Sequence, residues 1–166
     1  MILQIDDWKF DIDMERTMEY SANEAAGHCD CGYCRNFYAA VDLQYPNFRS
    51  FLAQFGLNAE APDELMPFDL NQQMCYMGVY VVAGRILQKG KQNLCVDGIF
   101  ISPEIDSQIN HNVLMPCFYL TIDQMDLPWV LDEPMKDVVS PANLPDFLRK
   151  MWRKLLGRRP KDNTVS

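Results

Sequence analysis

The sequence contains no complete catalytic motif. A glycine-rich phosphate loop, a nucleophile elbow, an HExxH segment and a pair of catalytic carboxylates are all missing. Histidine is scarce as well, since only His28 and His111 could serve in general acid–base catalysis. His111 lies in the polar sequence NHN between two predicted strands, where a histidine is usually solvated. These absences disfavour an enzyme and favour a non-catalytic binding or accessory domain.

Long apolar runs are also missing. The longest one, around residues 77–83, is far shorter than the roughly 20 residues that cross a bilayer. The opening sequence, MILQIDDWKF, has neither the basic start nor the apolar stretch of a secretory signal. We therefore expect a cytoplasmic protein without a membrane span, in which the six cysteines are reduced rather than paired in disulfides.

Positive charge is scarce outside the C-terminal segment. The chain has 15 Lys/Arg against 23 Asp/Glu, a net charge of -8. Seven of the Lys/Arg and one of the Asp/Glu lie in residues 149–166, so this segment carries +6 and the remainder carries -14. Binding of nucleic acid to the general surface is disfavoured, because phosphate attraction needs clustered positive charge.

The length and the apolar content predict one domain. A chain of 166 residues with 48% hydrophobic content can bury one core without a disulfide or a metal, and it is too short for two ordinary domains. We expect a single α+β domain over residues 1–157, followed by a basic and polar tail over residues 158–166.

The first third of the chain predicts a hairpin followed by helices. Two short runs with alternating residues within residues 1–12 predict an N-terminal β-hairpin. Helices are predicted at residues 14–26, 31–42 and 46–55. Asp13 and Asp30 stand where the first two helices need an N-cap. In the third, the apolar face consists of Phe48, Phe51, Leu52 and Phe55, which we expect in the core.

The middle of the chain predicts an antiparallel β-meander. Its three extended runs are MCYMGVYVVAGRIL, LCVDGIFIS and VLMPCFYLTI. The links between them are too short for crossover helices, so the strands should be antiparallel. Gly78 and Gly84 in the first run indicate a bulge or a close approach by another element. The later sequence DQMDLPWVLDEPM predicts an irregular link that is pinned to the body by Trp129.

A cluster of cysteines lies in the sequence GHCDCGYCRNFY, residues 27–38. Its candidate metal or redox residues are His28, Cys29, Cys31 and Cys34. Cys31 and Cys34 have the spacing of half a zinc site, and Cys29 or His28 could add a third ligand. No second half follows, so a fourth ligand would have to come across the fold. The isolated candidates for it are Cys75, Cys95, Cys117 and His111, and the three cysteines among them are predicted to be buried.

Two other chemistries and simple packing compete with zinc for this cluster. Cys31 and Cys34 at a helix start could form a thiol–disulfide redox pair, because helix N-terminal amides favour the thiolate. The βαβ context typical of such pairs is missing, and Asp30 places a negative charge beside Cys31. An iron–sulfur cluster is disfavoured, because the spacing Cys-x-Cys-x-x-Cys matches neither standard ferredoxin pattern. Alternatively, Cys31 and Cys34 simply pack one helical face against the sheet.

The C-terminal segment predicts an amphipathic helix over residues 143–157. Its apolar residues at spacings of three and four are Leu144, Phe147, Leu148, Met151, Trp152, Leu155 and Leu156. The candidate partner-binding residues are Arg149, Lys150, Trp152, Arg153 and Lys154. The helix could engage an anionic surface or a partner's groove. It could also place its apolar face on the protein's own sheet, as most amphipathic helices of small domains do.

Three segments together carry a resemblance to a known group of proteins. They are CDCGYCRNF, the later FLAQFGL and LPWVLDE near the C-terminus. The chain resembles, over most of its length, a group of small uncharacterised bacterial proteins with a Cys-x-Cys-x-x-Cys-Arg-Asn segment. The resemblance implies a shared fold but no activity, because the group has no established function.

The sequence therefore predicts an accessory or binding domain that acts through protein contacts, either with a protein partner or by self-association. The competing hypotheses are a thiol–disulfide oxidoreductase that uses Cys31 and Cys34, and a module stapled by zinc. No cofactor is assigned, and zinc is the candidate metal.

Overall fold

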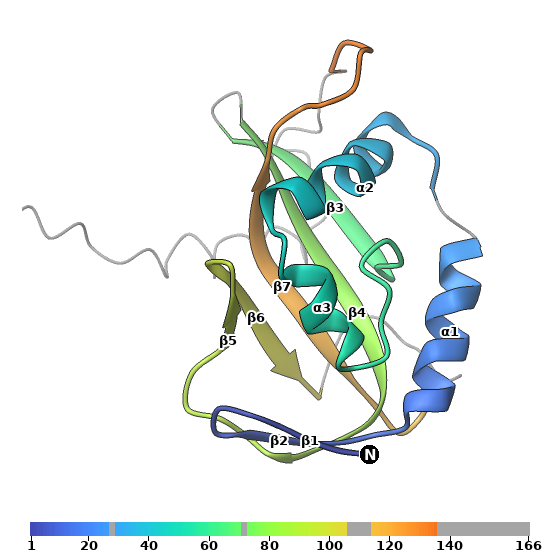
Figure 1. Ribbon diagram of the computed structural model, residues 1–166, viewed down its shortest axis with the longest axis vertical. Coiled ribbons are helices and arrows are strands. Elements are labelled where there is room, and N and C mark those ends of the chain that lie inside the picture. Colours follow the sequence, from blue (N-terminus) through green and yellow to red (C-terminus); the bar gives the residue numbers. More distant parts are fainter. Residues whose placement is uncertain (27–28, 71–72, 106–113, 136–166) are drawn as a thin grey trace, which may run out of the picture.

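The computed structural model describes residues 1–26, 29–70, 73–105 and 114–135 (Figure 1). The helices are α1 (Met14–Ala26), α2 (Gly32–Gln44) and α3 (Phe48–Ala53). The strands are β1 (Ile2–Ile5), β2 (Trp8–Ile12), β3 (Glu64–Leu70), β4 (Gln73–Gln88), β5 (Leu94–Val96), β6 (Ile99–Glu104) and β7 (Cys117–Leu127). The α+β class, the N-terminal hairpin and the antiparallel sheet are confirmed. In the described ranges, no helix has the length and apolar character that a bilayer span requires.

The seven strands form one antiparallel sheet that is organised by β4. Its order is β1-β2-β4-β7-β6-β5, and β3 also pairs with β4. Strands β5, β6 and β7 are consecutive neighbours, as in the predicted meander, but β4 pairs with β7 rather than with β5, so the meander wrongly places the first run beside the second. The other edge of β4 pairs first with β3 and then with β2. The long β4 therefore joins the N-terminal hairpin to the rest of the sheet.

One edge of β4 pairs with β3 up to Val79 and with β2 from Gly84 onward. Between these two pairings, the backbone of β4 forms hydrogen bonds with groups from outside the sheet. The backbone N–H of Val81 donates to the carboxylate of Asp63 (2.9 Å). The N–H of Ala83 donates to the buried hydroxyl of Thr17 (3.1 Å), and its carbonyl accepts from the N–H of Asp13 (2.9 Å). The two bonds of Ala83 attach the first turn of α1 to the edge of the sheet.

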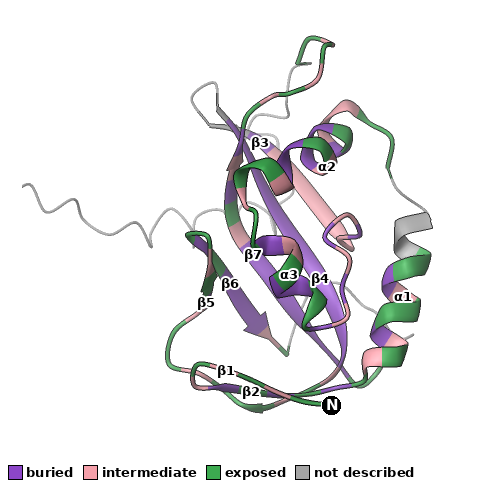
Figure 2. Ribbon diagram, viewed as in Figure 1, coloured by how far each residue is buried: buried purple, intermediate pink, exposed green. Residues whose placement is uncertain are grey.

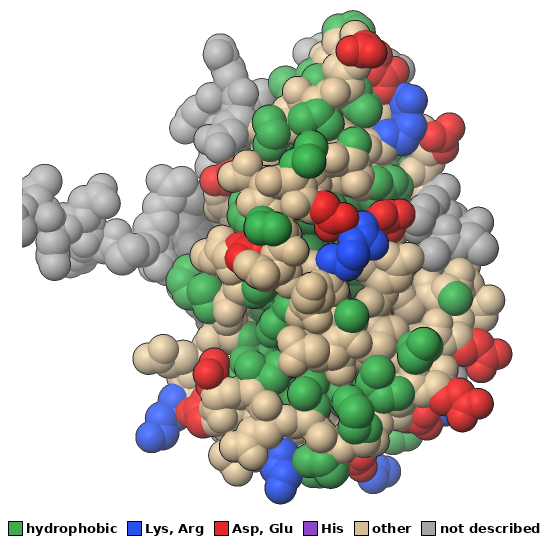
Figure 3. Space-filling view, in the orientation of Figure 1, with side chains coloured by type: hydrophobic (Ala, Val, Ile, Leu, Met, Phe, Trp, Pro, Cys, Tyr) green, Lys and Arg blue, Asp and Glu red, His purple; other side chains and the backbone are tan. Residues whose placement is uncertain are grey.

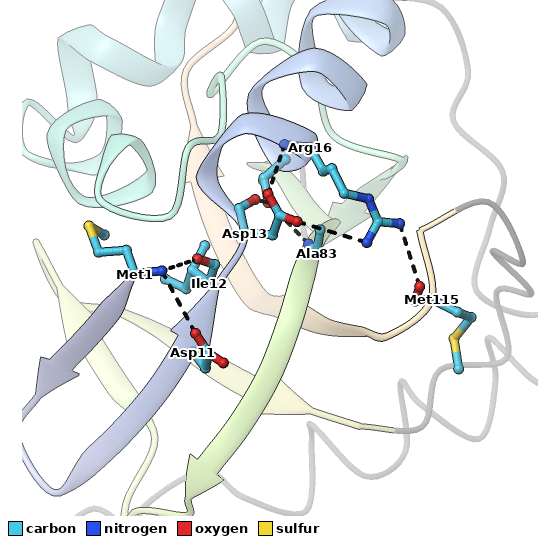
Figure 4. A network of polar contacts seen from close by, with 8 residues as sticks. Met1, Asp11, Ile12, Asp13, Arg16, Ala83 and Met115 are labelled. Carbon is cyan, nitrogen blue, oxygen red and sulfur yellow. Dashed lines mark hydrogen bonds and ion pairs between the residues drawn. The ribbon is translucent and has the colours of Figure 1, made fainter.

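Asp13 caps α1, as the sequence predicts. Its carboxylate accepts a hydrogen bond from the backbone N–H of Arg16 (3.2 Å), and the guanidinium of Arg16 reaches the carbonyl of Met115 (3.5 Å; Figure 4). The cap satisfies one of the N–H groups that the start of a helix leaves without an intrahelical partner.

Helices α2 and α3 cover one face of the sheet, and the main core lies between them and the strands (Figures 1 and 2). The predicted apolar face of the third helix is confirmed, because Phe48, Phe51, Leu52 and Phe55 are all buried. The fully buried residues of the sheet include Phe10, Tyr76, Tyr80, Val82, Phe118, Leu120 and Ile122. Their aromatic rings meet those of the helices in tilted or edge-to-face contacts, as Tyr80 does with Phe48 of α3 (6.3 Å).

The two glycines predicted to mark irregular backbone do so. At Gly84, where φ is 145°, a Cβ atom would lie 2.1 Å from the backbone oxygen of Asp11, so β2 and β4 approach too closely for any side chain. The register of β4 with β7 shifts between Tyr76 and Gly78, which is the bulge that the sequence indicates.

Four local predictions are wrong. The sequence DQMDLPWVLDEPM is not irregular throughout, because residues 123–127 are the end of β7 and pair with β4. The N-cap of α2 is Cys31 rather than Asp30, because the chain is still extended at Cys31 (φ -73°, ψ 155°) and turns into the helix one residue later than predicted. The run LCVDGIFIS is not one strand but the hairpin β5–β6, which turns where Asp97 and Gly98 both have positive φ. Cys95 is exposed, because it lies on the short edge strand β5 and points away from the core residue Leu94.

The described surface over α2 and α3 carries charges of both signs close together. Figure 3 shows basic side chains there next to acidic ones. Arg49, for example, forms ion pairs with Asp42 and Glu60, both at 2.7 Å. The described part of this face presents no continuous basic patch, in agreement with the low content of Lys/Arg in this part of the sequence.

Candidate metal centre

The thiols of Cys29, Cys31 and Cys34 form a cluster at the start of α2. Their three Sγ atoms all lie within 4.8 Å of one another. Cys29 and Cys31 are exposed, whereas Cys34 is buried. The structure thus brings together three of the four candidate residues, and the fourth, His28, lies outside the described residues.

The local backbone explains why three sulfur atoms meet. Cys31 is the N-cap of α2, and its carbonyl accepts the hydrogen bond of the first helical turn from the N–H of Arg35 (3.0 Å). Cys34 is one turn further along and so lies above Cys31 on the same side of the helix. Cys29 stands on the non-helical chain that leads into α2, two residues before Cys31. The cluster is therefore a product of one short segment.

The helix start lowers the pKa of the Cys31 thiol. Partial burial alone would raise this pKa. Hydrogen bonds from the backbone N–H of Cys34, from the side chains of Cys29 and Cys34 and from the backbone N–H of Tyr33 outweigh burial and stabilise the thiolate. The Cys31 thiol is accordingly deprotonated at a lower pH than an ordinary cysteine thiol.

The environment has the opposite effect on Cys34. Burial raises the pKa of this thiol far above its ordinary value, and its interactions with Cys31 and Cys29 raise it further. The pKa of the nearby Tyr38 phenol is raised as well, first by burial and then by the charge of Cys34. A cation placed among the three sulfur atoms would have the opposite effect on the Cys34 thiol and would favour its thiolate, because metal binding displaces thiol protons.

A strap of residues 128–135 (defined here as the C-terminal strap) lies over the first turn of α2. A Cβ atom on Gly32 would lie only 3.0 Å from the Oε1 atom of Glu133 and 3.5 Å from the ring of Trp129. Arg35 forms ion pairs with Asp30 (3.5 Å) and with Glu133. The strap therefore contacts the segment that carries the cysteines at Gly32 and at Arg35.

Trp129 pins the C-terminal strap to the body, as the sequence predicts. Its ring packs against the main core and meets Tyr33 edge to face at 6.0 Å. Its indole N–H donates to the carbonyl of Glu133 (2.8 Å), which closes the strap on itself.

Asn36 fixes the strap to α2, and this role was not predicted from the sequence. The Asn36 side chain is fully buried, and its amide donates to the hydroxyl of Tyr76 and to the carbonyl of Pro128, both at 3.1 Å. Its oxygen accepts from the N–H of Val130 (2.8 Å). The available signal was its position, because Asn36 is a polar residue on the apolar side of a helix between Tyr33 and Ala40.

The isolated cysteines do not complete the cluster. Among the described residues, Cys75, Cys95 and Cys117 are not part of the group that contains Cys29, Cys31 and Cys34. Cys75 and Cys117 are buried, as predicted, at other places in the sheet. The remaining candidate for a fourth ligand, His111, lies outside the described residues. So do the C-terminal helix, the tail and the partner-binding candidates Arg149, Lys150, Trp152, Arg153 and Lys154.

No family model, no curated protein and no solved structure matches this chain in the three comparisons. A hypothesis about its function therefore depends on the chain's own residues and on their geometry.

Proposed function

We propose that the chain is a non-catalytic binding module whose three thiolates, Cys29, Cys31 and Cys34, hold one thiophilic metal ion, with zinc as the first candidate. The observation that carries the proposal is the mutual distance of at most 4.8 Å between the three Sγ atoms. A tetrahedral zinc ion with Zn–S bonds of about 2.3 Å needs sulfur atoms about 3.8 Å apart. Rotations of the side chains supply a contraction of this size, because two of the three thiols are exposed.

The donor set fits an open metal site. Three thiolates from the chain leave one position of a tetrahedral zinc ion for a histidine, a water molecule or a ligand from outside. His28 is next to Cys29 in the sequence and is the candidate from this chain. The exposure of Cys29 and Cys31 gives a metal direct access from solvent. Soft thiolate ligands favour Zn²⁺ or Cu⁺ over Mg²⁺ or Ca²⁺.

The second candidate function is thiol–disulfide exchange. Cys31 is exposed and Cys34 is buried, which suits an attacking and a resolving thiol. In this reaction the Cys31 thiolate would attack a substrate disulfide and release one substrate thiolate. The Cys34 thiolate would then attack the mixed disulfide, so that the substrate leaves as a dithiol and Cys31–Cys34 is oxidised. Cys29 favours the metal site over this reaction, because a third sulfur adds a ligand but has no part in a two-thiol exchange.

The test is the metal content of the reduced protein and of four variants. Native mass spectrometry of the reduced chain with zinc should give one zinc ion per chain. Each of Cys29→Ser, Cys31→Ser and Cys34→Ser should weaken zinc binding by at least about tenfold, a typical loss when a metal site is disturbed. Cys95→Ser is the matched control, because Cys95 is exposed but lies outside the cluster. Equal zinc binding by all four variants would refute the proposal.

Equilibration with reduced and oxidised glutathione tests the second candidate. A Cys31–Cys34 disulfide that forms reversibly in metal-free protein and reduces a disulfide substrate in turn would favour thiol exchange. The proposed metal site predicts instead that one equivalent of zinc protects all three thiols from oxidation. The involvement of a protein partner and the cytoplasmic location remain predictions.

A further inference from the structure

The sheet has a second apolar face, opposite the one that α2 and α3 cover. Side chains of adjacent residues in a strand point to opposite faces. Because Tyr76, Tyr80 and Val82 of β4 lie in the main core, the odd-numbered residues of β4 point to this second face. The buried apolar residues of the second face include Phe68, Cys75, Met77, Val79, Val81, Ala83, Cys117 and Tyr119.

The described helices leave this face without a cover of their own. Helices α2 and α3 pack on the opposite side (Figure 1). Within the described part of the chain, the second core around Val79, Val81 and Tyr119 also includes Leu114, and Tyr20 of α1 packs against it from the sheet edge. Nevertheless Val81 and Ala83 are fully buried. A two-sided apolar sheet requires a layer on each side.

We propose that residues 144–156 form this layer, with their apolar side on the second face of the sheet. This segment lies outside the described residues, and its sequence has the pattern that the face needs. Seven apolar residues recur in it at spacings of three and four, from Leu144 to Leu156. Thirteen residues of helix are about 20 Å long. The stripe from Cys75 to Ala83 on β4 is about 26 Å long, so one helix spans most of it.

The end of the described chain lies close enough for this docking. Met135 lines a pocket together with Met74, Asp126 and Leu127, so it lies beside the start of β4. Residues 136–143 can extend over roughly 26 Å, which exceeds the roughly 10 Å that separates two packed layers. Charge also favours the contact, because residues 149–166 carry +6 and the rest of the chain carries -14.

The docking has a consequence for the protein's surface. With the apolar side on the sheet, Arg149, Lys150, Arg153 and Lys154 would point outward. They would form a basic patch on an otherwise acidic protein, and such a patch suits an acidic partner.

Nuclear Overhauser effects in the unmodified full chain test the proposal directly. The indole protons of Trp152 should give effects to the methyl groups of Val79 or Val81. A sample that mixes labelled and unlabelled chains distinguishes contacts within one chain from contacts between two. The absence of these effects would overturn the proposal, and so would effects that arise only between chains, since a second copy would then be the cover.

The reactivity of Cys117 provides a second test with a matched control. Cys117 lies on the second face and is 9% exposed. Leu148→Asp places a charge on the apolar side of the segment, and Lys150→Asp places the same residue on its polar side. Leu148→Asp should increase the rate of Cys117 alkylation by at least about tenfold through opening of the cover, whereas Lys150→Asp should leave the rate within about twofold of the parent. Equal rates in the two variants would contradict the proposal. If Leu148→Asp fails to fold, the measurement on the unmodified chain decides.

Discussion

The buried amide of Asn36 should contribute more to stability than any exposed asparagine that also makes a hydrogen bond. Its side chain is fully buried and makes three hydrogen bonds, one to Tyr76 and two to the backbone of the strap at Pro128 and Val130. The change Asn36→Ala removes all three. It also cuts the attachment between α2 and the strap that lies over the first turn of α2.

The expected loss of stability depends on whether each partner of Asn36 finds another hydrogen bond after the substitution. The hydroxyl of Tyr76 keeps the carbonyl of Tyr33 as an acceptor (3.0 Å), so it remains paired. Pro128 and Val130 are exposed residues, so water can replace Asn36 at their backbone groups. Each lost bond then costs about 1 kcal/mol rather than the larger penalty of an unpaired buried group. The three bonds together account for about 3 kcal/mol, and the small cavity that remains adds to this, so the free energy of unfolding should fall by at least about 3 kcal/mol.

Urea unfolding measures this change, and Asn47→Ala is the control. The Asn47 side chain is exposed and donates to the carboxylate of Asp97 (2.8 Å), so its loss should cost below about 1 kcal/mol. Hydrogen exchange at the N–H of Val130 should become faster in Asn36→Ala and remain unchanged in Asn47→Ala. If the two variants lose the same stability, or if the Val130 exchange rate is unaffected, Asn36 does not fasten the strap.

Three further predictions concern backbone strain, alkaline pH and thiol reactivity. Gly84→Ala should destabilise the fold by at least about 3 kcal/mol, because the Cβ would clash with a backbone oxygen at 2.1 Å. Gly98→Ala is the control and should cost about 1 kcal/mol, because Gly98 has φ 81° but no atom within 4 Å of the added Cβ. Similar losses of stability of the two variants in urea would contradict this prediction. Burial raises the pKa of Tyr76 from 10.0 to about 12, so the contribution of its neutral phenol to stability is complete below pH 10 and is lost as the pH rises towards 12. Tyr76→Phe should flatten this part of the curve of stability against pH. An unchanged slope would contradict the prediction. In metal-free protein, alkylation of Cys31 should reach half its maximal rate below the ordinary thiol pKa of 9.0, and a midpoint at or above that value would refute the effect of the helix start.

The parts of the fold that depend on neighbouring residues could be predicted from the sequence. Asp13 caps α1, and the aromatic side of the third helix is buried, because capping and helical spacing are local properties. The pairing of β7 with β4 was not predictable, since contacts between strands distant in the sequence leave little local signal. The turn within LCVDGIFIS was missed because an Asp-Gly pair between two short apolar runs was interpreted as the interior of one strand.

The same division applies to the candidate site. The helical spacing of Cys31 and Cys34 predicts that they lie one turn apart. The position of Cys29, in contrast, depends on the extended backbone at Cys31. That backbone was not predicted, because a cap at Asp30 would have placed Cys31 inside the helix. The strap could be predicted only in part. Trp129 stood out as an anchor, but the hydrogen bonds of Asn36 connect residues about 90 positions apart and become visible only in the folded chain.

The most direct test of the proposed metal site is X-ray absorption spectroscopy of the zinc-loaded protein. If Cys29, Cys31 and Cys34 are the ligands, the spectrum should show three sulfur neighbours at about 2.3 Å and one lighter ligand around each zinc ion. The number of sulfur neighbours should fall to two in the variants of these cysteines that still bind zinc, and it should remain three in Cys95→Ser. A zinc ion surrounded only by nitrogen and oxygen atoms would contradict the account.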